Sequence, residues 1–199
     1  MRTSILNLLL TVILGQNVVL SQIGVTYNIN GDNHEVQSQR YGYSFHWPKK
    51  WWIASNTGGP YFFNYSHHYF DAHGVRLGVP KGGAEIGIIS DAQSHDAGSI
   101  DKWMELDRTA HGFSSTRELQ LPPETTIRRA VEAVSFHDDG DSRHKKITRT
   151  TAIYFEFQGG ILAAFLRYNA NDPKGVEYEK TLIAVVQSFR PLTGVDHSK

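Results

Sequence analysis

The sequence predicts an α+β fold in a single domain, in which helices pack on a mostly antiparallel sheet. Two strands and a helix near the C-terminus carry this prediction. Alternating apolar and polar residues over Ile147–Phe157 indicate a half-buried strand, and the apolar run Ile161–Tyr168 indicates a central strand covered on both faces. Gln158-Gly159-Gly160 between them supplies the glycines that hairpin turns need. A hairpin with a helix packed on it is the nucleus of a layered domain.

The predicted helix follows the second strand directly. Asp172 is suited to cap the free N–H groups of the first turn, and Pro173 is tolerated there because its missing N–H would be unpaired anyway. Pro191 marks the end of the predicted helix. Apolar residues recur at helical spacing and form one buried face: Tyr178, Leu182, Val185, Val186 and Phe189.

Length and composition limit the classes of protein to which this chain can belong. The 199 residues suit one domain plus a targeting segment, and an apolar content of 40% with 12% aromatic residues is enough for an ordinary core. Lys plus Arg equals Asp plus Glu at 20 each, so no basic footprint for nucleic acid is present. The absence of cysteine excludes disulfides, thiolate metal sites, cysteine nucleophiles and a lipoprotein anchor.

Residues 1–21 are predicted to be a signal peptide. Arg2 gives a positive start, Ile5–Leu14 forms an apolar core, and the small residues Val19 and Ser21 precede a cleavage point near Ser21. The sequence therefore predicts a secreted or periplasmic protein. An uncleaved membrane anchor is the alternative, and a buried core helix is disfavoured at an extreme N-terminus.

After the predicted signal peptide, the chain divides into an N-terminal segment, one domain and a C-terminal tail. Gly15-Gln16-Asn17 breaks the apolar run well before the ~20 residues of a membrane helix, so no stable membrane insertion is expected after cleavage. Residues 22–39 are polar and non-periodic, which indicates a linker or a loose first strand. Residues 40–192 form the domain, and 193–199 are expected to be a disordered tail.

Within the domain, a strand over Tyr41–Trp47 has one aromatic face and ends at Pro48. A turn over residues 49–52 and a loop over 56–60 follow. Further strands are predicted over Tyr61–Tyr65 and Ala84–Asp91.

Ser99 then caps a helix over Ile100–His111, and Gly112 sits where a C-terminal cap belongs. Its expected buried stripe is Ile100, Trp103, Met104 and Ala110. Residues 119–123 form a connector. The segment Ile127–His137 fits a helix or a strand from its own pattern.

Three segments resemble PsbP-like domains. Tyr-Gly-Tyr-Ser-Phe-His-Trp-Pro at 41–48, followed by a basic and aromatic turn, is similar to the opening of these domains. The C-terminal hairpin, Asn-Asp-Pro and a helix closing on Gln187-Ser-Phe189 resemble their end, and Pro80–Ile86 is similar to a turn and strand of bacterial secreted members. The resemblance spans about Tyr41–Leu192.

The resemblance implies a single-domain α/β/α sandwich with a central, mostly antiparallel sheet. It favours a strand over Ile127–His137, with residues 138–142 in a solvated hairpin loop. The superfamily includes an extrinsic photosystem II subunit and a nuclear factor that binds the GTPase Ran, so the fold hosts unrelated binding roles. No functional residue of those proteins is matched in this chain.

The segment His67–His73 is the strongest candidate for a metal site. If it is extended, His67, Asp71 and His73 share one face, and imidazole with carboxylate is a ligand set for zinc or other divalent ions. Their spacing matches no established metal motif, so a solvated loop is the favoured interpretation and a metal site the alternative.

No pattern predicts catalysis or a cofactor. The chain lacks Gly-x-Ser-x-Gly and a glycine-rich phosphate loop with its lysine, and the acidic turn at Asp138–Asp141 has the wrong spacing for calcium. Glu85 and Asp91 are an even number of residues apart on one strand, where exposed carboxylates are expected. No catalytic residue and no cofactor are therefore assigned.

Two adjacent tryptophans are the candidate binding surface. Trp51 and Trp52 cannot both point inward on a strand, so one is expected to be exposed, as in binding surfaces. The leading hypothesis is an exported, non-enzymatic PsbP-like domain that binds another protein or a cell-envelope component. The alternatives are a metal-binding or metal-dependent protein using the His67–His73 segment, and a structural accessory domain.

Overall fold

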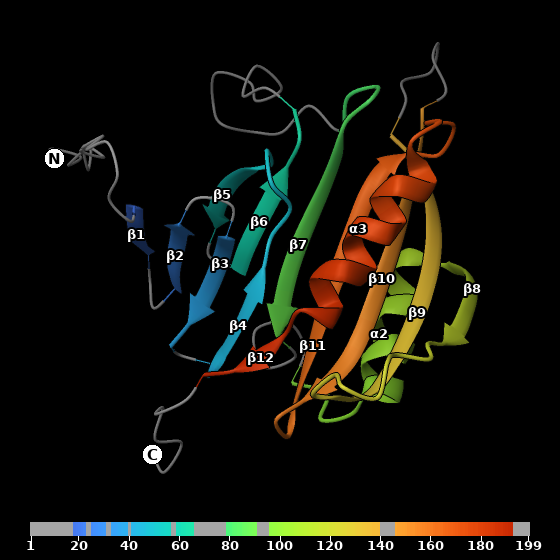
Figure 1. Ribbon diagram of the computed structural model, residues 1–199. Coiled ribbons are helices and arrows are strands. Elements are labelled where there is room, and N and C mark those ends of the chain that lie inside the picture. Colours follow the sequence, from blue (N-terminus) through green and yellow to red (C-terminus); the bar gives the residue numbers. More distant parts are fainter. Residues whose placement is uncertain are drawn as a thin grey trace, which may run out of the picture.

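In the residues that it describes, the structure, a computed structural model, has two antiparallel sheets and the two helices α2 and α3 (Figure 1). This arrangement confirms the α+β class and the antiparallel sheet that the sequence predicts. The structure describes residues 18–22, 25–30, 33–39, 41–56, 59–65, 79–90, 96–139 and 146–192.

The larger sheet has seven strands in the order β5-β6-β7-β11-β10-β9-β8. Its three longest strands, β9, β10 and β11, are adjacent, so the middle of the sheet is wide enough to carry a helix on each face. The strands are β5 Trp52–Asn56, β6 Gly59–Phe63, β7 Ala84–Ser90, β8 Phe113–Glu118, β9 Ile127–Asp138, β10 Ile147–Phe157 and β11 Gly160–Asn169.

The hairpin β10–β11 forms as the sequence predicts. Phe157 pairs with Gly160, and the two residues between them, Gln158 and Gly159, have φ of 49° and 79°. Two-residue hairpin turns with positive φ match the right-handed twist of the flanking strands. The ambiguous segment Ile127–His137 is a strand, since it lies within β9. The preceding strand β8 was not expected.

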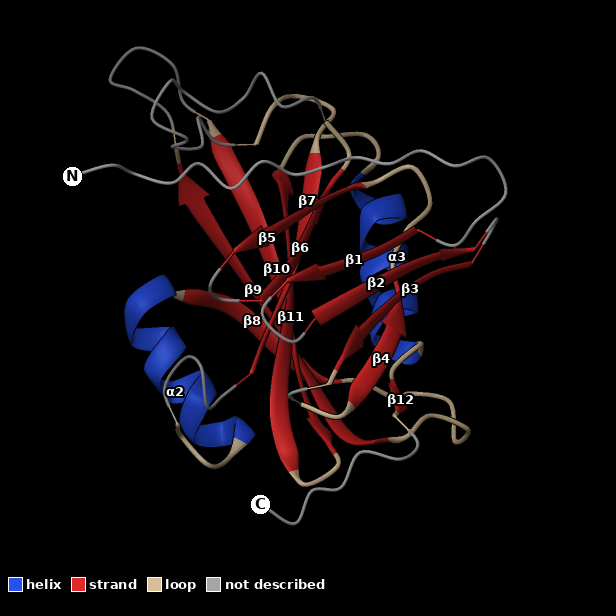
Figure 2. Ribbon diagram, turned by 90° about the vertical axis from the view of Figure 1, so that its left-hand side faces the viewer, coloured by secondary structure: helices blue, strands red, loops and turns tan. Residues whose placement is uncertain are grey.

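Helix α3 (Gly175–Gln187) lies on one face of the large sheet, and helix α2 (Ile100–His111) lies on the other (Figures 1 and 2). The predicted apolar face is confirmed, because all its members are at most 3% exposed: Tyr178, Leu182, Val185 and Val186 in α3, and Phe189 two residues beyond its end.

The start of α3 differs from the prediction. Lys174 occupies the N-cap position without a side-chain hydrogen bond, and Asp172 lies in the preceding turn. The Asp172 carboxylate accepts hydrogen bonds from the backbone N–H of Lys174 at 2.9 Å and of Gly82 at 2.8 Å. Asp172 therefore joins the turn before α3 to the turn before β7.

The caps of α2 are those that the sequence predicts. The Ser99 hydroxyl accepts a hydrogen bond from the N–H of Lys102 at 3.2 Å, and Gly112 ends the helix with φ of 62°. Ile100, Trp103 and Met104 are buried as expected. Ala110 is exposed, and its assignment to the buried stripe was wrong because α2 leaves the sheet surface toward its C-terminal end.

A second sheet, which the sequence analysis missed, packs beside α3 on the same face (Figure 1). Its order is β1-β2-β3-β4-β12, with β1 Val18–Gln22, β2 Val25–Asn30, β3 Asn33–Ser38, β4 Tyr43–His46 and β12 Arg190–Pro191. Residues 25–30 and 33–38 are thus strands, so of the two interpretations of residues 22–39, a linker or a loose first strand, the structure agrees with strand. Strand β1 pairs with β2 only, so cleavage near Ser21 would remove an edge strand and keep the other pairings.

Aromatic rings fill the space between the second sheet and the large sheet. Tyr43, Phe45 and Trp47 are at most 4% exposed, which confirms the predicted aromatic face of this strand. The Phe189 ring stacks on Phe45 with centroids 4.7 Å apart and meets Phe155 at 5.0 Å. Among the described residues, no helix is long and apolar enough to span a bilayer.

Candidate functional site

A cavity of about 640 Å³ lies on the α2 face of the large sheet, between the C-terminal half of α2 and strands β7, β9, β10 and β11. This volume falls within the ~300–1,000 Å³ typical of small-molecule sites. The cavity belongs to the face that carries the smaller of the two main core clusters, which α2 covers in part.

Short side chains on adjacent strands create the hollow. Ala133 of β9 pairs with Ala152 of β10, so their methyl groups are neighbours, and Ala163 of β11 lies opposite Tyr154 of β10 on the same face. A sheet face carries side chains from alternate residues, and alanine there leaves the space above the strands unfilled.

The walls of the cavity are aromatic. Trp103 of α2 meets Tyr154 edge-on with centroids 5.5 Å apart, and both rings are almost fully buried. Phe113 lies 6.4 Å from Tyr154, and Phe165 lies across the cavity from them on β11. Phe113 and Phe165 are half-buried and therefore accessible from the open side.

One wall carries a short hydrogen bond between helix and sheet. The Tyr154 hydroxyl donates to Oδ2 of Asp107 at 2.6 Å. Burial, and then the hydrogen bond and charge of Asp107, raise the pKa of Tyr154 far above its ordinary value. Tyr154 therefore remains a neutral hydrogen-bond donor at any physiological pH.

A buried carboxylate, that of Glu85, lies beside Arg167 of the cavity wall. Glu85 is fully buried, whereas an exposed position was expected for it. The reason is a set of distant partners: the Tyr65 hydroxyl donates to Glu85 Oε2 at 2.8 Å, and an Arg167 guanidinium nitrogen lies 3.5 Å from Oε1. A buried charge is tolerated when it is paired in this way.

Arg167 links this buried charge to the cavity. It lines the cavity, and its guanidinium also lies 3.5 Å from Oδ2 of Asp139. Asp139 accepts a hydrogen bond from Thr148 and lies 3.8 Å from Nε2 of His137. Arg167 is thus held between two carboxylates, one behind the cavity wall and one on its rim.

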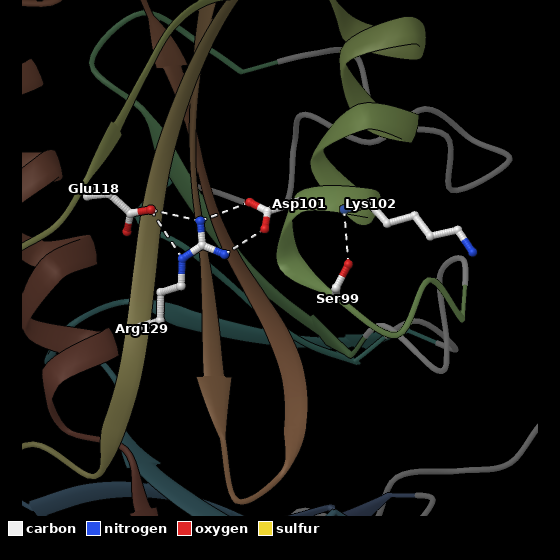
Figure 3. A network of polar contacts seen from close by, with 5 residues as sticks. All are labelled: Ser99, Asp101, Lys102, Glu118 and Arg129. Atoms are coloured by element: carbon white, nitrogen blue, oxygen red, sulfur yellow. Dashed lines mark hydrogen bonds and ion pairs between the residues drawn. The ribbon is translucent and has the colours of Figure 1, made fainter.

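Helix α2 is fixed over the cavity by the Arg129 clamp, which consists of Arg129, Asp101 and Glu118 (Figure 3). The Arg129 guanidinium of β9 donates to both oxygens of Asp101 in the first turn of α2, at 2.8 and 3.0 Å, and to Glu118 of β8 at 2.8 Å. The hydrogen bond from Arg129 lowers the pKa of Asp101. The clamp holds the N-terminal end of α2, while the cavity lies beside its C-terminal end.

The described residues that line the cavity include charged and titratable side chains: Asp107, Asp139, Arg167, His111 and His137. The last turn of α2 also lies at the cavity. Its carbonyl end carries a partial negative charge, and the turn holds the basic side chains Arg108 and His111. The cavity therefore combines apolar and aromatic side chains with several polar ones.

The predicted metal site lies elsewhere. His67, Asp71 and His73 fall outside the described residues, so that expectation stays a prediction. Within the part of the chain that the structure describes, no group of three or more His, Asp or Glu side chains is arranged to hold a metal ion.

The two adjacent tryptophans differ in solvent exposure, as the sequence predicts. Trp51 is half-buried and meets Tyr178 edge-on with centroids 6.4 Å apart, whereas Trp52 is 55% exposed. Trp52 is the residue of the pair that is available to a partner, and its binding role stays a prediction.

No pattern in the sequence predicted the cavity. One signal was present: Arg167 interrupts the apolar run of a central strand, and a charged residue there requires a partner. The partners could not be read from the pattern, because Glu85 and Asp139 are far from Arg167 in the sequence and only the pairing of β7 with β11 places Glu85 opposite it.

Comparisons with known proteins identify only distant structural similarity. No family model matches the chain, and none of the curated proteins matches it. A crystal structure from Bacteroides thetaiotaomicron has a TM-score of 0.45 and 11% identity over 78% of this chain and 47% of that one, so this chain spans about half of its length. The Ran-binding protein Mog1p of Saccharomyces cerevisiae has a TM-score of 0.42 and 10% identity over 84% of this chain and 97% of that one. Neither similarity assigns a family.

Proposed function

We propose that this chain is an exported, non-catalytic binding domain of the PsbP-like type, and that the cavity on the α2 face receives its ligand. The observation that carries the proposal is a partly open cavity in which apolar and aromatic side chains are combined with polar ones. Ligand sites generally have this composition, because apolar burial supplies affinity and a small number of polar groups fix orientation.

Three features support export, the PsbP-like type and a ligand other than nucleic acid. The first residues have the pattern of a secretory signal, which favours a ligand found in the cell envelope or outside it. Helices on both faces of an antiparallel sheet agree with the arrangement that the PsbP-like resemblance implies. The balanced charge offers no electrostatic attraction for nucleic acid.

Filling the cavity tests the binding role. Ala152→Leu places a larger apolar side chain on the cavity floor, where Ala152 is half-buried and has room above it. The matched control is Ala184→Leu, which makes the same change on the exposed side of α3, away from the cavity. Titration with the neutral dye Nile red should give a saturable blue shift for the unchanged protein and the control. Ala152→Leu should bind at least about tenfold more weakly, equivalent to ~1.4 kcal/mol.

Dye binding that is the same in Ala152→Leu as in the unchanged protein would contradict this role for the cavity. Export is tested separately by N-terminal sequencing of protein recovered from the medium or periplasm. A new N-terminus near residue 22 is expected, and intact Met1 on soluble cytoplasmic protein would contradict export.

A further inference from the structure

Strand β8 forms the outer edge of the large sheet, at the end opposite β5 (Figure 1). In the part of the chain that the structure describes, β8 pairs with β9 only, and its residues 114–118 are all exposed. The N–H of Leu119 donates to the carbonyl oxygen of Ala130 at 2.9 Å, which fixes the direction of the neighbouring backbone groups. Because successive residues of a strand alternate in direction, Thr116 and Glu118 turn their N–H and C=O groups outward.

The charged side chains of β8 are engaged by β9. Arg117 donates to both carboxylate oxygens of Glu132, at 2.8 and 3.0 Å. Glu118 accepts a hydrogen bond from Arg129 at 2.8 Å. Charges commonly guard an exposed edge against pairing, but here both are held by the neighbouring strand, and the middle of the edge, Ser115-Thr116, is uncharged.

The edge is open on the α2 side. Helix α2 packs on β9 and β10, and a groove of about 560 Å³ separates it from β8. The groove is lined by Met104 and Arg108 of α2 and by Thr116 of β8. The β-bulge between Phe113 and Ser115 lies at the N-terminal end of the strand, so the pairing of residues 115–118 with β9 is regular. Regular edge strands of this kind accept an additional strand through their backbone groups.

The sequence of β8 suits pairing with a second copy of itself. In an antiparallel pair the outward-facing residues lie opposite one another, so the allowed registers are two residues apart. With Thr116 opposite Thr116 of the partner subunit, Ser115 lies opposite Arg117 of the partner subunit and no like charges meet. One neighbouring register would place Arg117 opposite Arg117 of the partner subunit, and the other would centre the pair on Ser115, next to the bulge.

We infer that β8 is the contact surface for a second copy of this chain, and that the two β8 strands pair antiparallel about a two-fold axis at Thr116. The two large sheets then form one continuous sheet, to which each subunit contributes the same residues. This association pairs the outward N–H and C=O groups and removes the exposed edge. It goes beyond the proposed binding role and does not depend on the cavity.

Sedimentation equilibrium of the purified protein over a range of concentrations tests the association, and a reversible dimer is expected. Thr116→Pro removes an N–H that β9 does not use, and proline is tolerated on edge strands at such positions. It should weaken the dimer at least about tenfold. The matched control is Thr116→Val, which keeps the N–H and the β-branched shape and should leave the dissociation constant within about threefold.

A charge exchange at the two-fold axis tests the register. Thr116→Lys and Thr116→Glu each place like charges opposite one another, so each variant alone should dissociate more readily than the unchanged protein. An equimolar mixture of the two should associate more tightly than either variant alone, because opposite charges then face each other across the axis. Circular dichroism and thermal unfolding establish that each variant is folded, and this pair of variants carries the test if Thr116→Pro does not fold.

Three outcomes would overturn the inference. The first is a monomer at every concentration of the unchanged protein. The second is a dimer that Thr116→Pro and Thr116→Lys leave unchanged, because another surface would then carry the association. The third is a mixture of Thr116→Lys and Thr116→Glu that associates no more tightly than either variant alone, which would refute the pairing about Thr116.

Discussion

Gly87 of β7 and Phe165 of β11 are cross-strand partners beside the cavity, and their contact offers a sharp test of the structure. A methyl group at Gly87 would lie 2.2 Å from Cζ of Phe165, and 2.7 and 2.8 Å from its two Cε atoms. Such distances are well inside van der Waals contact, so the Phe165 ring lies directly over the Gly87 backbone. Gly87→Ala therefore forces the ring to move toward the cavity.

Two opposing effects determine how much Gly87→Ala changes the free energy of unfolding. Overpacking costs about 1–3 kcal/mol in a packed interior. Replacing glycine by alanine at a position that any residue can adopt stabilises by about 0.4–1 kcal/mol, because the unfolded chain loses freedom. The φ of Gly87 is not positive, so this gain applies here. We expect a net loss of about 1–2 kcal/mol in the free energy of unfolding.

Gly87→Ala should stabilise the protein instead of destabilising it when the Phe165 ring is removed. In the Phe165→Ala background the steric conflict is absent, and Gly87→Ala should stabilise by about 0.4–1 kcal/mol. Urea unfolding of the four proteins of this cycle, followed by tryptophan fluorescence, measures the coupling directly. Equal destabilisation by Gly87→Ala in both backgrounds would refute the placement of the Phe165 ring over Gly87.

Four further outcomes are expected. Phe155→Ala should cost about 3–5 kcal/mol because its ring is fully buried, whereas Phe165→Ala should cost about 2 kcal/mol because its ring is half-buried. Unchanged urea midpoints would mean that the strand register is wrong. Stability should fall above about pH 10, because burial raises the pKa values of Tyr154, Tyr168 and Tyr178 while the unfolded chain releases its phenol protons there. Tyr154→Phe should reduce that slope, and a urea midpoint that is constant from pH 9 to 11 would contradict this explanation. Replacing His67, Asp71 and His73 together by alanine should leave the melting temperature the same with and without zinc, and a zinc-dependent rise that the triple variant abolishes would establish the metal alternative.

The sequence predicted the elements whose patterns are local. The strands of the β10–β11 hairpin show their alternation and their glycine turn within one stretch, and the α3 face repeats at helical spacing. The caps of α2 are also local, since Ser99 and Gly112 act within a few residues of themselves. Each of these signals depends on neighbours along the chain, so no knowledge of the tertiary contacts is needed.

The second sheet gave a mixed signal. Its strand β4 lies within the predicted strand Tyr41–Trp47, whose aromatic face is visible in the sequence. Residues 25–38 gave a weaker signal because they include many polar residues, although Val36 belongs to the core cluster. Strands β2 and β3 pair with a register such as Tyr27 with Val36. Such pairing depends on both strands, so the pattern within one of them does not report it.

The cavity was unpredictable for a different reason. Ala133, Ala152 and Ala163 come from three separate strands, and only the register of β9, β10 and β11 places them all at the cavity. Glu85 is buried where Tyr65, which follows β6, and Arg167, its partner on β11, both reach it. Cross-strand register is set by the whole sheet, so a pattern within one strand cannot report it.

The two faces of the large sheet differ in the size of the core cluster that they carry. The face under α3 and the second sheet carries the larger core cluster, including Phe45, Phe155 and Phe189 with their mutual ring contacts. The α2 face carries a smaller cluster and is interrupted by the alanine floor. Because large apolar side chains on the first face supply most of the buried area, the second face can leave space unfilled at modest cost to the fold. Substitutions on the α3 face should therefore change the free energy of unfolding, and substitutions on the α2 face should change ligand affinity first.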